Sequence, residues 1–367
     1  MFIQPQKKSE NRIVRKRGGA EYEYEYEYKN SIKKYDFFCK NEIEISEKIK
    51  KIPFFSLYFK PLHGYKLVNM AEIDDQQFEK CDIVKNNTHI LIQYQRENES
   101  ILFSDCFCFN KQSNKQSNKQ SNQQSNQQSN QQNILHMIHS FRNLSKSIQL
   151  LNDFRIIILN IHPIFIQYQK NQSKRYIMTD FTKAISHDIA STINNVNVLN
   201  PYISQYNPRN IYWPIELHIL CYINERNKQS ISKSNLEEIY DDILDTAALS
   251  PCGKYINKEL KDPILFSLQY LVNKPKRVIQ ETILSEKFVS TWNNYSLSIM
   301  YLHLISFMEN MYGHHNFFQR FSRLLINNIH FIAEKRESVF KTGELFEELV
   351  DSISEEGWNR LIGGGIA

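Results

Sequence analysis

The spacing of hydrophobic and polar residues predicts mostly strands in the first part of the chain. Residues 21–28 read Glu-Tyr four times, and strict alternation with an aromatic residue that favours strands predicts a strand with one aromatic face. Apolar residues then recur at helical spacing over 39–51, and Pro53 would end this helix. Short apolar runs predict further strands of an antiparallel sheet at 54–59, 89–94 and 101–109.

The pattern after residue 133 is mainly helical. Apolar residues from Ile134 to Leu151 recur at helical spacing and predict a long helix of about 20 residues. Three short strand-like runs follow at 155–159, 164–168 and 176–179, and the pattern of 183–210 is that of a loop. Helical spacing returns at 214–224, 234–249, 262–273, 281–290, 296–312, 317–328 and 345–353. The order of these elements predicts an α+β chain in two lobes.

Two segments divide the chain. Residues 110–133 repeat the tetrapeptide Asn-(Lys/Gln)-Gln-Ser and contain no apolar side chain, so they cannot bury a core and we expect a disordered insert. Residues 1–20 are expected to form a disordered basic arm. Between and after these segments we expect a β-rich lobe at 21–109, a helical lobe at 134–350 and a tail at 351–367.

The basic surplus of the chain lies near its N-terminus. Lys and Arg number 45 and Asp and Glu 40, a net of +5. Residues 7–17 hold six basic side chains and one acid, also a net of +5, so the rest of the chain is balanced. The body therefore does not favour nucleic acid as a partner, while the arm remains a candidate for docking on nucleic acid or an acidic surface.

Composition also narrows the class of protein. Hydrophobic residues make up 41% of the chain, which excludes wholesale disorder. The six cysteines are scattered, and we expect them to be free thiols of a reducing compartment. The first residues lack an apolar signal segment, and no run of about 18 apolar residues occurs, so we expect a soluble intracellular protein without a membrane span.

Three stretches resemble the protein-kinase superfamily, most closely the kinase-like proteins of large DNA viruses. Residues 31–52 resemble the strand with the family's lysine and the helix with its glutamate, 155–183 the catalytic loop and metal-binding Asp-Phe-Gly, and 206–223 the end of the activation segment. Weaker matches lie at 291–299 and 334–336. The resemblance implies a bilobal fold with a small β-rich N-lobe, which carries one main helix, and a larger helical C-lobe. A viral origin would place the protein in the host cytoplasm.

The resemblance implies a nucleotide site for ATP and Mg²⁺. Lys33 would hold the phosphates, with Lys34 as the alternative, and Glu42 would pair with that lysine. Asp180-Phe181-Thr182 keeps the Asp and Phe of the metal-binding motif, so Asp180 would hold one Mg²⁺. The phosphate-covering loop departs from the family, since no GxGxxG occurs and only Gly18-Gly19 lies near the expected place.

The catalytic loop departs from the family pattern at three polar positions. Pro163 and its apolar neighbours set the register, in which Asn160 replaces the catalytic Asp, His162 the Lys and Phe165 the metal-binding Asn. An amide is a far poorer proton acceptor than a carboxylate, and a phenyl ring offers no metal ligand. The resemblance therefore implies a catalytically impaired pseudokinase, a regulator or scaffold that engages a protein partner and keeps a residual nucleotide site.

Two other functions stay open. An active atypical protein kinase would transfer a phosphoryl group from ATP to Ser or Thr of a protein substrate, and a nucleotidyl transferase is the related alternative. Either would use Lys33, Glu42 and Asp180 with a base from elsewhere, and Asp153 and Asp188 are the nearest carboxylates. A binding module would instead dock the basic N-terminal arm on nucleic acid or on an acidic surface.

One structural ion pair of the family cannot form in this chain, because an arginine takes the place of its glutamate. The family's Pro-Glu at the end of the activation segment is Pro208-Arg209 here, and Arg336 stands for the C-lobe Arg that would pair with its Glu. Two arginines cannot form an ion pair, so Arg336 needs a different acid. Glu216 is the candidate partner, and this hypothesis fails if Arg336 is exposed and unpaired.

Overall fold

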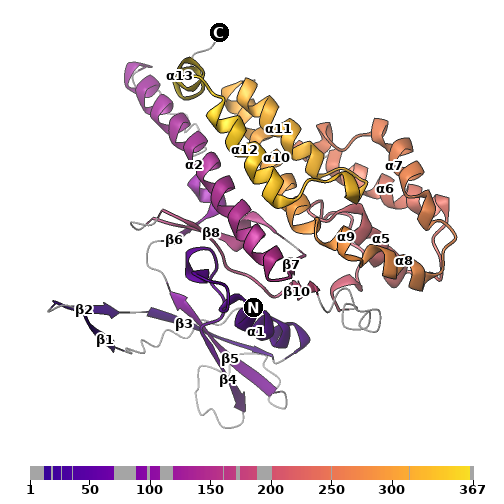
Figure 1. The fold of residues 1–367 in the computed structure, drawn as a ribbon, viewed down its shortest axis with the longest axis horizontal. Coiled ribbons are helices and arrows are strands. Elements are labelled where there is room, and N and C mark those ends of the chain that lie inside the picture. The colour runs from indigo at the N-terminus through magenta and orange to yellow at the C-terminus, as the bar shows by residue number, and fades with distance from the viewer. Residues whose placement is uncertain are drawn as a thin grey trace. The chain divides into compact units, whose positions relative to one another are not determined.

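The chain forms two compact units. The computed structural model describes residues 12–17, 20–25, 27–34, 36–69, 88–96, 100–107, 119–159, 161–170, 174–187, 201–248, 250–313 and 315–363. The first unit combines Met1–Ile101 with Gln167–Ala184, and the second combines Leu102–Ile166 with Ile185–Ala367. Helices alternate with small sheets along the chain, so the expected α+β class is confirmed (Figure 1).

A three-stranded antiparallel sheet of order β3-β5-β4 is the core of the first unit. β3 spans Glu27–Lys34, β4 Gly64–Asn69 and β5 Thr88–Arg96, and α1 (Phe37–Ile49) lies between β3 and β4 in the chain. The Asp36 carboxylate caps α1 by accepting a hydrogen bond from the Cys39 N–H at 3.0 Å. Cys39 and Ile43 of this helix form one apolar cluster with Leu62, Ile90 and Ile92, so burial of this helix face holds it on the sheet.

A separate hairpin contains the basic residues near the N-terminus. β1 (Arg12–Arg17) pairs antiparallel with β2 (Ala20–Glu25). The register sets Arg12 opposite Glu25 and Lys16 opposite Glu21, so basic positions of one strand oppose acidic positions of the other.

The segment 167–184 joins the first unit through β9 (Tyr176–Met178). This strand belongs to a sheet of order β6-β8-β9, in which β6 spans Ser100–Leu102 and β8 Ile166–Gln169. The Met178 N–H donates to the Tyr58 carbonyl at 3.0 Å, and the Lys60 N–H donates to the Met178 carbonyl at 2.9 Å. Phe181 then packs edge-on against Phe59, with ring centroids 6.2 Å apart, and these contacts fix the backbone that leads into residues 180–184.

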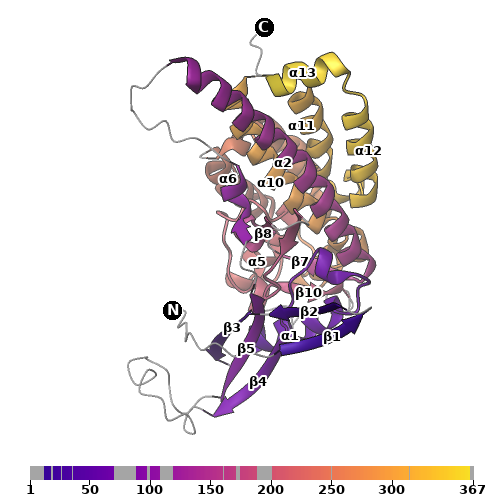
Figure 2. The same ribbon diagram turned by 90° about the vertical axis from the view of Figure 1, so that its left-hand side faces the viewer.

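Five helices of the second unit pack against one another (Figure 2). They are α2 (Lys119–Asp153), α10 (Trp292–Tyr312), α11 (Asn316–Asn328), α12 (Val339–Asp351) and α13 (Glu355–Gly363). Phe141 of α2 lies at the centre, with ring centroids 4.9 Å from Tyr301, 4.9 Å from Phe321 and 4.4 Å from Phe346. Such edge-on and tilted ring contacts add to the stability that burial alone supplies.

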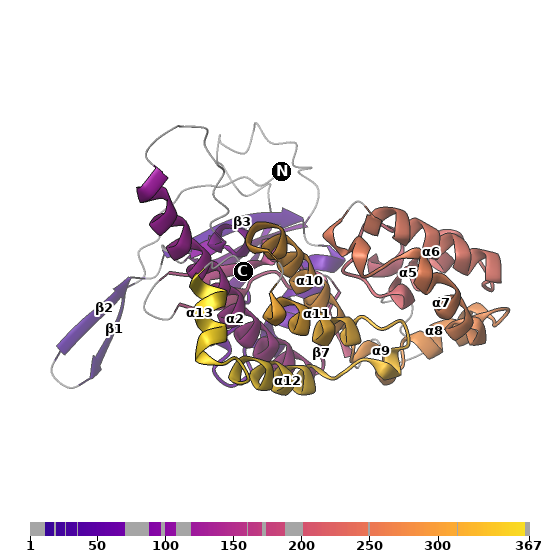
Figure 3. The same cartoon turned by 90° about the horizontal axis from the view of Figure 1, so that it is seen from above.

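A second group of helices completes this unit (Figure 3). They are α5 (Ile215–Glu225), α6 (Lys233–Ala248), α7 (Lys261–Ser267), α8 (Lys276–Ile283) and α9 (Glu286–Val289). Every residue of α5 from Ile215 to Ile223 is buried, which is the pattern of a helix enclosed on all sides.

Strands β7 (Ile156–Ile158) and β10 (Ala184–Ser186) pair with each other. Short 3₁₀ turns lie at Phe55–Leu57, Phe103–Cys106, Pro163–Phe165, Pro251–Lys254, Lys258–Leu260, Gln269–Leu271 and Ala333–Lys335.

Two segments that we expected to be disordered contain regular structure. Residues 119–133 form the first turns of α2, because Gln, Lys and Ser are compatible with a helix and no Gly or Pro interrupts the register from residue 134 backward. Residues 12–17 of the expected arm form β1. Ala20 begins β2. The rest of both predictions, at 1–11, 18–19 and 110–118, lies outside the described residues.

Several predicted boundaries are also wrong. The run at 54–59 forms a 3₁₀ turn instead of a strand, and the strand expected at 101–109 ends at Leu102. The Glu-Tyr repeat is divided between β2 and β3 instead of forming one strand. The lobe boundary moves as well, since 102–109 belongs to the second unit and 167–184 to the first. The tail at 351–367 contains α13, which packs on α2.

Asn293 is predicted to hold β7 between α2 and α10. This residue is 1% exposed; its side chain accepts from the Ile158 N–H at 2.8 Å and donates to Asn152 Oδ1 at 2.8 Å and to the Ile156 carbonyl at 3.1 Å. Asn293→Ala leaves these buried groups without partners, so it should lower the free energy of unfolding in urea by about 2–4 kcal/mol. The exposed Asn327→Ala control should change it by less than about 0.5 kcal/mol. Equal effects of the two variants would contradict this role.

Candidate functional site

The first unit buries the carboxylate of Glu42 beneath its sheet. Glu42 lies in the second turn of α1 and is 2% exposed. Its Oε1 accepts a hydrogen bond from the Tyr94 hydroxyl at 2.9 Å. Tyr94 follows Ile90 and Ile92 at two-residue spacing on β5 and therefore lies on the face that packs against α1. The sheet thus presents one polar hydroxyl to the one acid that α1 buries at this face.

Strand register separates the two candidate lysines. Lys33 lies directly opposite Ile90 in the β3–β5 ladder, whereas Lys34 lies opposite His89. Because directly opposed residues of an antiparallel ladder share a face of the sheet, the position of Lys33 is on the face covered by α1 and that of Lys34 is on the other. The register agrees with the choice of Lys33. Its side chain lies outside what the structure describes, so the ion pair with Glu42 stays a prediction.

Asp180 lies in a tight turn directly after β9. Its Oδ1 accepts hydrogen bonds from the Thr182 N–H at 2.9 Å and from the Thr182 hydroxyl at 2.6 Å, the type of local bond that Asp favours in turns. The Asn41 side chain of α1 donates to the Ala184 carbonyl at 2.6 Å and ties the end of this turn to the helix. Asp180 is only half-buried, and its Oδ2 makes no hydrogen bond within the described part of the chain.

Glu42, Tyr94 and Asp180 form one electrostatic cluster within the first unit. Burial raises the pKa of Tyr94 most, and the Glu42 charge, its hydrogen bond and the Asp180 charge raise the pKa further. Tyr94 therefore remains a neutral hydrogen-bond donor at ordinary pH. Two carboxylates that both act on one buried phenol create a negative centre, and such a centre favours a bound cation, either a lysine ammonium or a metal ion.

The residues of the degenerate catalytic loop lie in the second unit. His162 begins a 3₁₀ turn, and its Nδ1 accepts a hydrogen bond from the Ile164 N–H at 3.2 Å. Burial lowers the pKa of His162, so the ring is neutral at pH 7. Phe165 is half-buried with its ring centroid 6.1 Å from that of His162. Asn160 lies outside the described residues, and the hydrocarbon ring of Phe165 cannot coordinate a metal.

Acidic side chains are scarce around the segment that resembles the catalytic loop. Between Phe154 and His187 the sequence has a single acid, Asp180. Asp153 is the last residue of α2 and is exposed to solvent, and Asp188 lies outside the described residues.

The proposed partner of Arg336 is confirmed. Arg336 Nη2 lies 2.8 Å from Glu216 Oε1, and the two side chains are 1% and 0% exposed. Arg336 also donates from Nε to the His330 carbonyl at 2.6 Å and from Nη1 to the Thr291 hydroxyl at 3.0 Å. Arg209, at the position that the resemblance assigned to the family's Glu, is exposed. The acid that pairs with Arg336 lies in the first turn of α5.

Tyr94 is the functional residue that the sequence reasoning missed. Its strand was predicted at 89–94, but an aromatic residue in an apolar run is normally a core residue. The available signal was the alternation of Ile90, Ile92 and Tyr94, which places the hydroxyl on the apolar face of the sheet, where it must find a partner.

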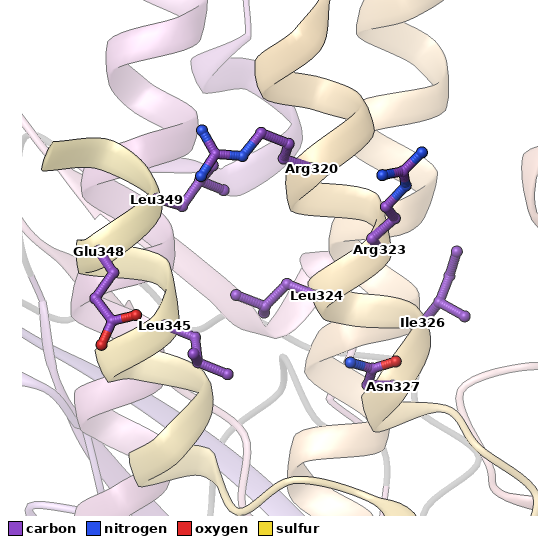
Figure 4. A pocket seen from close by; sticks show the side chains of 8 residues that line it. All are labelled: Arg320, Arg323, Leu324, Ile326, Asn327, Leu345, Glu348 and Leu349. Atoms are coloured by element: carbon purple, nitrogen blue, oxygen red, sulfur yellow. The ribbon is translucent and has the colours of Figure 1, made fainter. Parts of the chain in front are cut away.

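One hollow on the described surface contains none of the predicted residues. It is an open groove of about 530 Å³ between α11 and α12 (Figure 4). Arg320 and Arg323 of α11 lie on one side and Glu348 of α12 on the other, with Leu324, Leu345 and Leu349 along the floor. Nothing in the groove links it to nucleotide chemistry.

Comparisons with known proteins add no family. No protein-family model and no curated protein matches the chain. Within the ranges described above, no three His, Cys, Asp or Glu side chains are arranged to hold a metal. No helix in those ranges has the length and apolarity needed to cross a membrane.

The Glu216–Arg336 pair is expected to dominate the stability of the second unit. Glu216→Ala leaves the Arg336 guanidinium buried without its counter-ion and should lower the free energy of unfolding by about 3–5 kcal/mol. The apolar double variant Glu216→Leu/Arg336→Met should recover much of that loss. As a control, Glu237→Ala removes the exposed pair with Lys233 (3.8 Å) and should cost less than about 1 kcal/mol. Chemical denaturation measures all three, and a double variant less stable than Glu216→Ala would refute the assignment.

Proposed function

We propose that this protein is kinase-like, binds a nucleotide in its first unit and has lost efficient phosphoryl transfer, so that it acts as a regulator or scaffold for a protein partner. The observation that carries the proposal is the buried Glu42 carboxylate, which accepts a hydrogen bond from the Tyr94 hydroxyl, with the charge of Asp180, distant in sequence, acting on the same phenol. The helix that bears Glu42 follows the strand that bears Lys33, as the kinase mechanism requires of its lysine and glutamate.

The first unit has groups that fit one Mg²⁺ and the phosphates of ATP. Mg²⁺ in nucleotide sites takes one or two carboxylates together with phosphate oxygens and water, and Asp180 Oδ2 is the carboxylate oxygen not engaged by Thr182. Lys33 would hold phosphate while Glu42 holds the lysine. A bound Mg²⁺ would supply charge neutralisation on the phosphates. The fit stops at one metal, because the second metal-binding position is Phe165.

The loss of phosphoryl transfer follows from the lack of a suitable proton acceptor. Transfer to a hydroxyl needs a carboxylate that orients the attacking group, and the loop offers the amide Asn160 and a neutral imidazole. His162 is unsuited to this task because its Nδ1 is already engaged by the backbone of Ile164. With no base and no second metal ligand, nucleotide binding would serve to stabilise a conformation that a protein partner recognises.

The basic arm does not support a nucleic-acid function. Strand pairing opposes Arg12 to Glu25 and Lys16 to Glu21. Acidic positions across the ladder weaken the positive potential that would attract a polyanion, so the hairpin is a poor binding surface for nucleic acid.

Nucleotide binding should depend on Asp180 and on Lys33 but not on Lys34. With Mg²⁺ and ATP at about 100 times the dissociation constant, the wild type should gain about 2.7 kcal/mol, measured as a higher thermal midpoint. Asp180→Asn should abolish the Mg²⁺-dependent part of this shift, and Lys33→Met should weaken binding roughly tenfold or more by removing a charged phosphate contact. Lys34→Met, on the opposite face of the strand, is the matched control. No shift at millimolar ATP, or equal losses for the two lysines, would overturn the nucleotide site.

Phosphoryl transfer should be absent and partly restorable. The wild type should transfer no labelled γ-phosphate to itself or to a mixed protein substrate. Asn160→Asp combined with Phe165→Asn supplies the missing base and metal ligand, and a positioned base alone contributes about 10²–10⁴-fold, so transfer should become detectable. Wild-type transfer that Asp180→Asn eliminates would instead establish an active atypical kinase.

A further inference from the structure

A pocket in the second unit adjoins the Glu216–Arg336 pair. It is a partly open pocket of about 180 Å³ among α5, α6, α7, α10 and the segment after α11. Its wall is mainly apolar and includes Trp213, Ile243, Ile264 and Tyr295. The guanidinium-bearing side chain of Arg336 forms part of the same wall.

A space of this size needs a physical reason. Protein interiors are packed like organic crystals, and voids larger than a water molecule are few. Water gains little in an apolar space because it finds too few polar partners there, and an apolar cavity of about 150 Å³ stays dry and takes up benzene or xenon. The pocket beside Arg336 is therefore large enough for one aromatic ring or a short hydrocarbon chain.

The charges around the pocket select against an ionic ligand. Arg336 is neutralised by Glu216, and its other bonds go to the His330 carbonyl and the Thr291 hydroxyl. An anion entering the pocket would lose its hydration without gaining an unpaired cation, and a cation would meet the guanidinium.

His330 is one of the polar residues on the wall, and its Nδ1 accepts a hydrogen bond from the Ile332 N–H at 3.0 Å. An imidazole that accepts at Nδ1 carries its proton at Nε2. The ring therefore has one N–H donor at a mainly apolar pocket, which suits a ligand with one hydrogen-bond acceptor.

We propose that this pocket binds a small uncharged molecule that consists of an apolar ring or short chain with one carbonyl or ether oxygen. The ligand would fill the space beside Trp213 and Ile264 and accept from His330. Since Arg336 forms part of the wall, occupancy would stabilise the junction of helices that the Glu216–Arg336 pair holds. This site is independent of the nucleotide site in the first unit.

Three probes that share a phenyl ring test the proposal on the full chain. Benzene lacks an acceptor, acetophenone adds a carbonyl, and benzoate adds a charge. Titration followed by the thermal midpoint should give binding for acetophenone, about fivefold weaker binding for benzene because one neutral hydrogen bond is lost, and none for benzoate. Absence of a shift with both benzene and acetophenone, or benzoate binding as tight as acetophenone, would overturn the proposal.

Substitutions in the pocket wall test whether the probes bind in this pocket. Ile264→Phe or Ile243→Phe should fill the space and weaken both neutral probes at least tenfold, and two positions are used in case one variant does not fold. His330→Phe should abolish the preference for acetophenone over benzene but retain benzene binding. Unchanged binding in a folded filling variant would show that the probes bind elsewhere and would refute the pocket.

Discussion

A buried carboxylate and a buried guanidinium are stable only as a pair. In this chain one such pair holds together several helix ends of the second unit. Glu216 comes from the first turn of α5 and Arg336 from the segment that leads into α12. The remaining guanidinium bonds reach the residue before α10 and a residue just after α11. Either ion alone would cost several kcal/mol, so the sequence can bury these helix ends only where the pair forms. The mainly apolar pocket described above lies beside the same junction, since Arg336 forms part of its wall.

The first unit contains carboxylates around a buried tyrosine instead of a buried ion pair. It bonds the buried Glu42 carboxylate to the Tyr94 hydroxyl, and the charge of Asp180 acts on the same phenol. A negative centre of this kind is costly unless a cation balances it, and Lys33 together with a metal-bound nucleotide is the balance that we propose. In the second unit, His162 is not a charged base and Phe165 is not a metal ligand. In our proposal the chain keeps groups that would hold a nucleotide and lacks those that would use it.

Sequence patterns correctly predicted elements that have a long periodic apolar face. They failed where the structure depends on tertiary packing. The helix at 39–51 corresponds to α1, and the need of Arg336 for an acid correctly identified Glu216. The extension of α2 over 119–133 was missed, because a polar repeat can continue a helix that its apolar end has already started. Tyr94 was missed because its role depends on which strand face meets α1, and the pocket beside Arg336 was missed because its wall comes from several segments that only tertiary packing brings together.

The most direct measurement is a crystal structure of the chain grown with Mg²⁺ and a non-hydrolysable ATP analogue. We expect electron density for the nucleotide in the first unit, with phosphate on Lys33, one Mg²⁺ on Asp180 and the Tyr94–Glu42 hydrogen bond intact. No metal should lie at Phe165. Absence of the nucleotide, or a second metal ion coordinated in the loop around Asn160, would contradict a nucleotide-binding protein that has lost transfer.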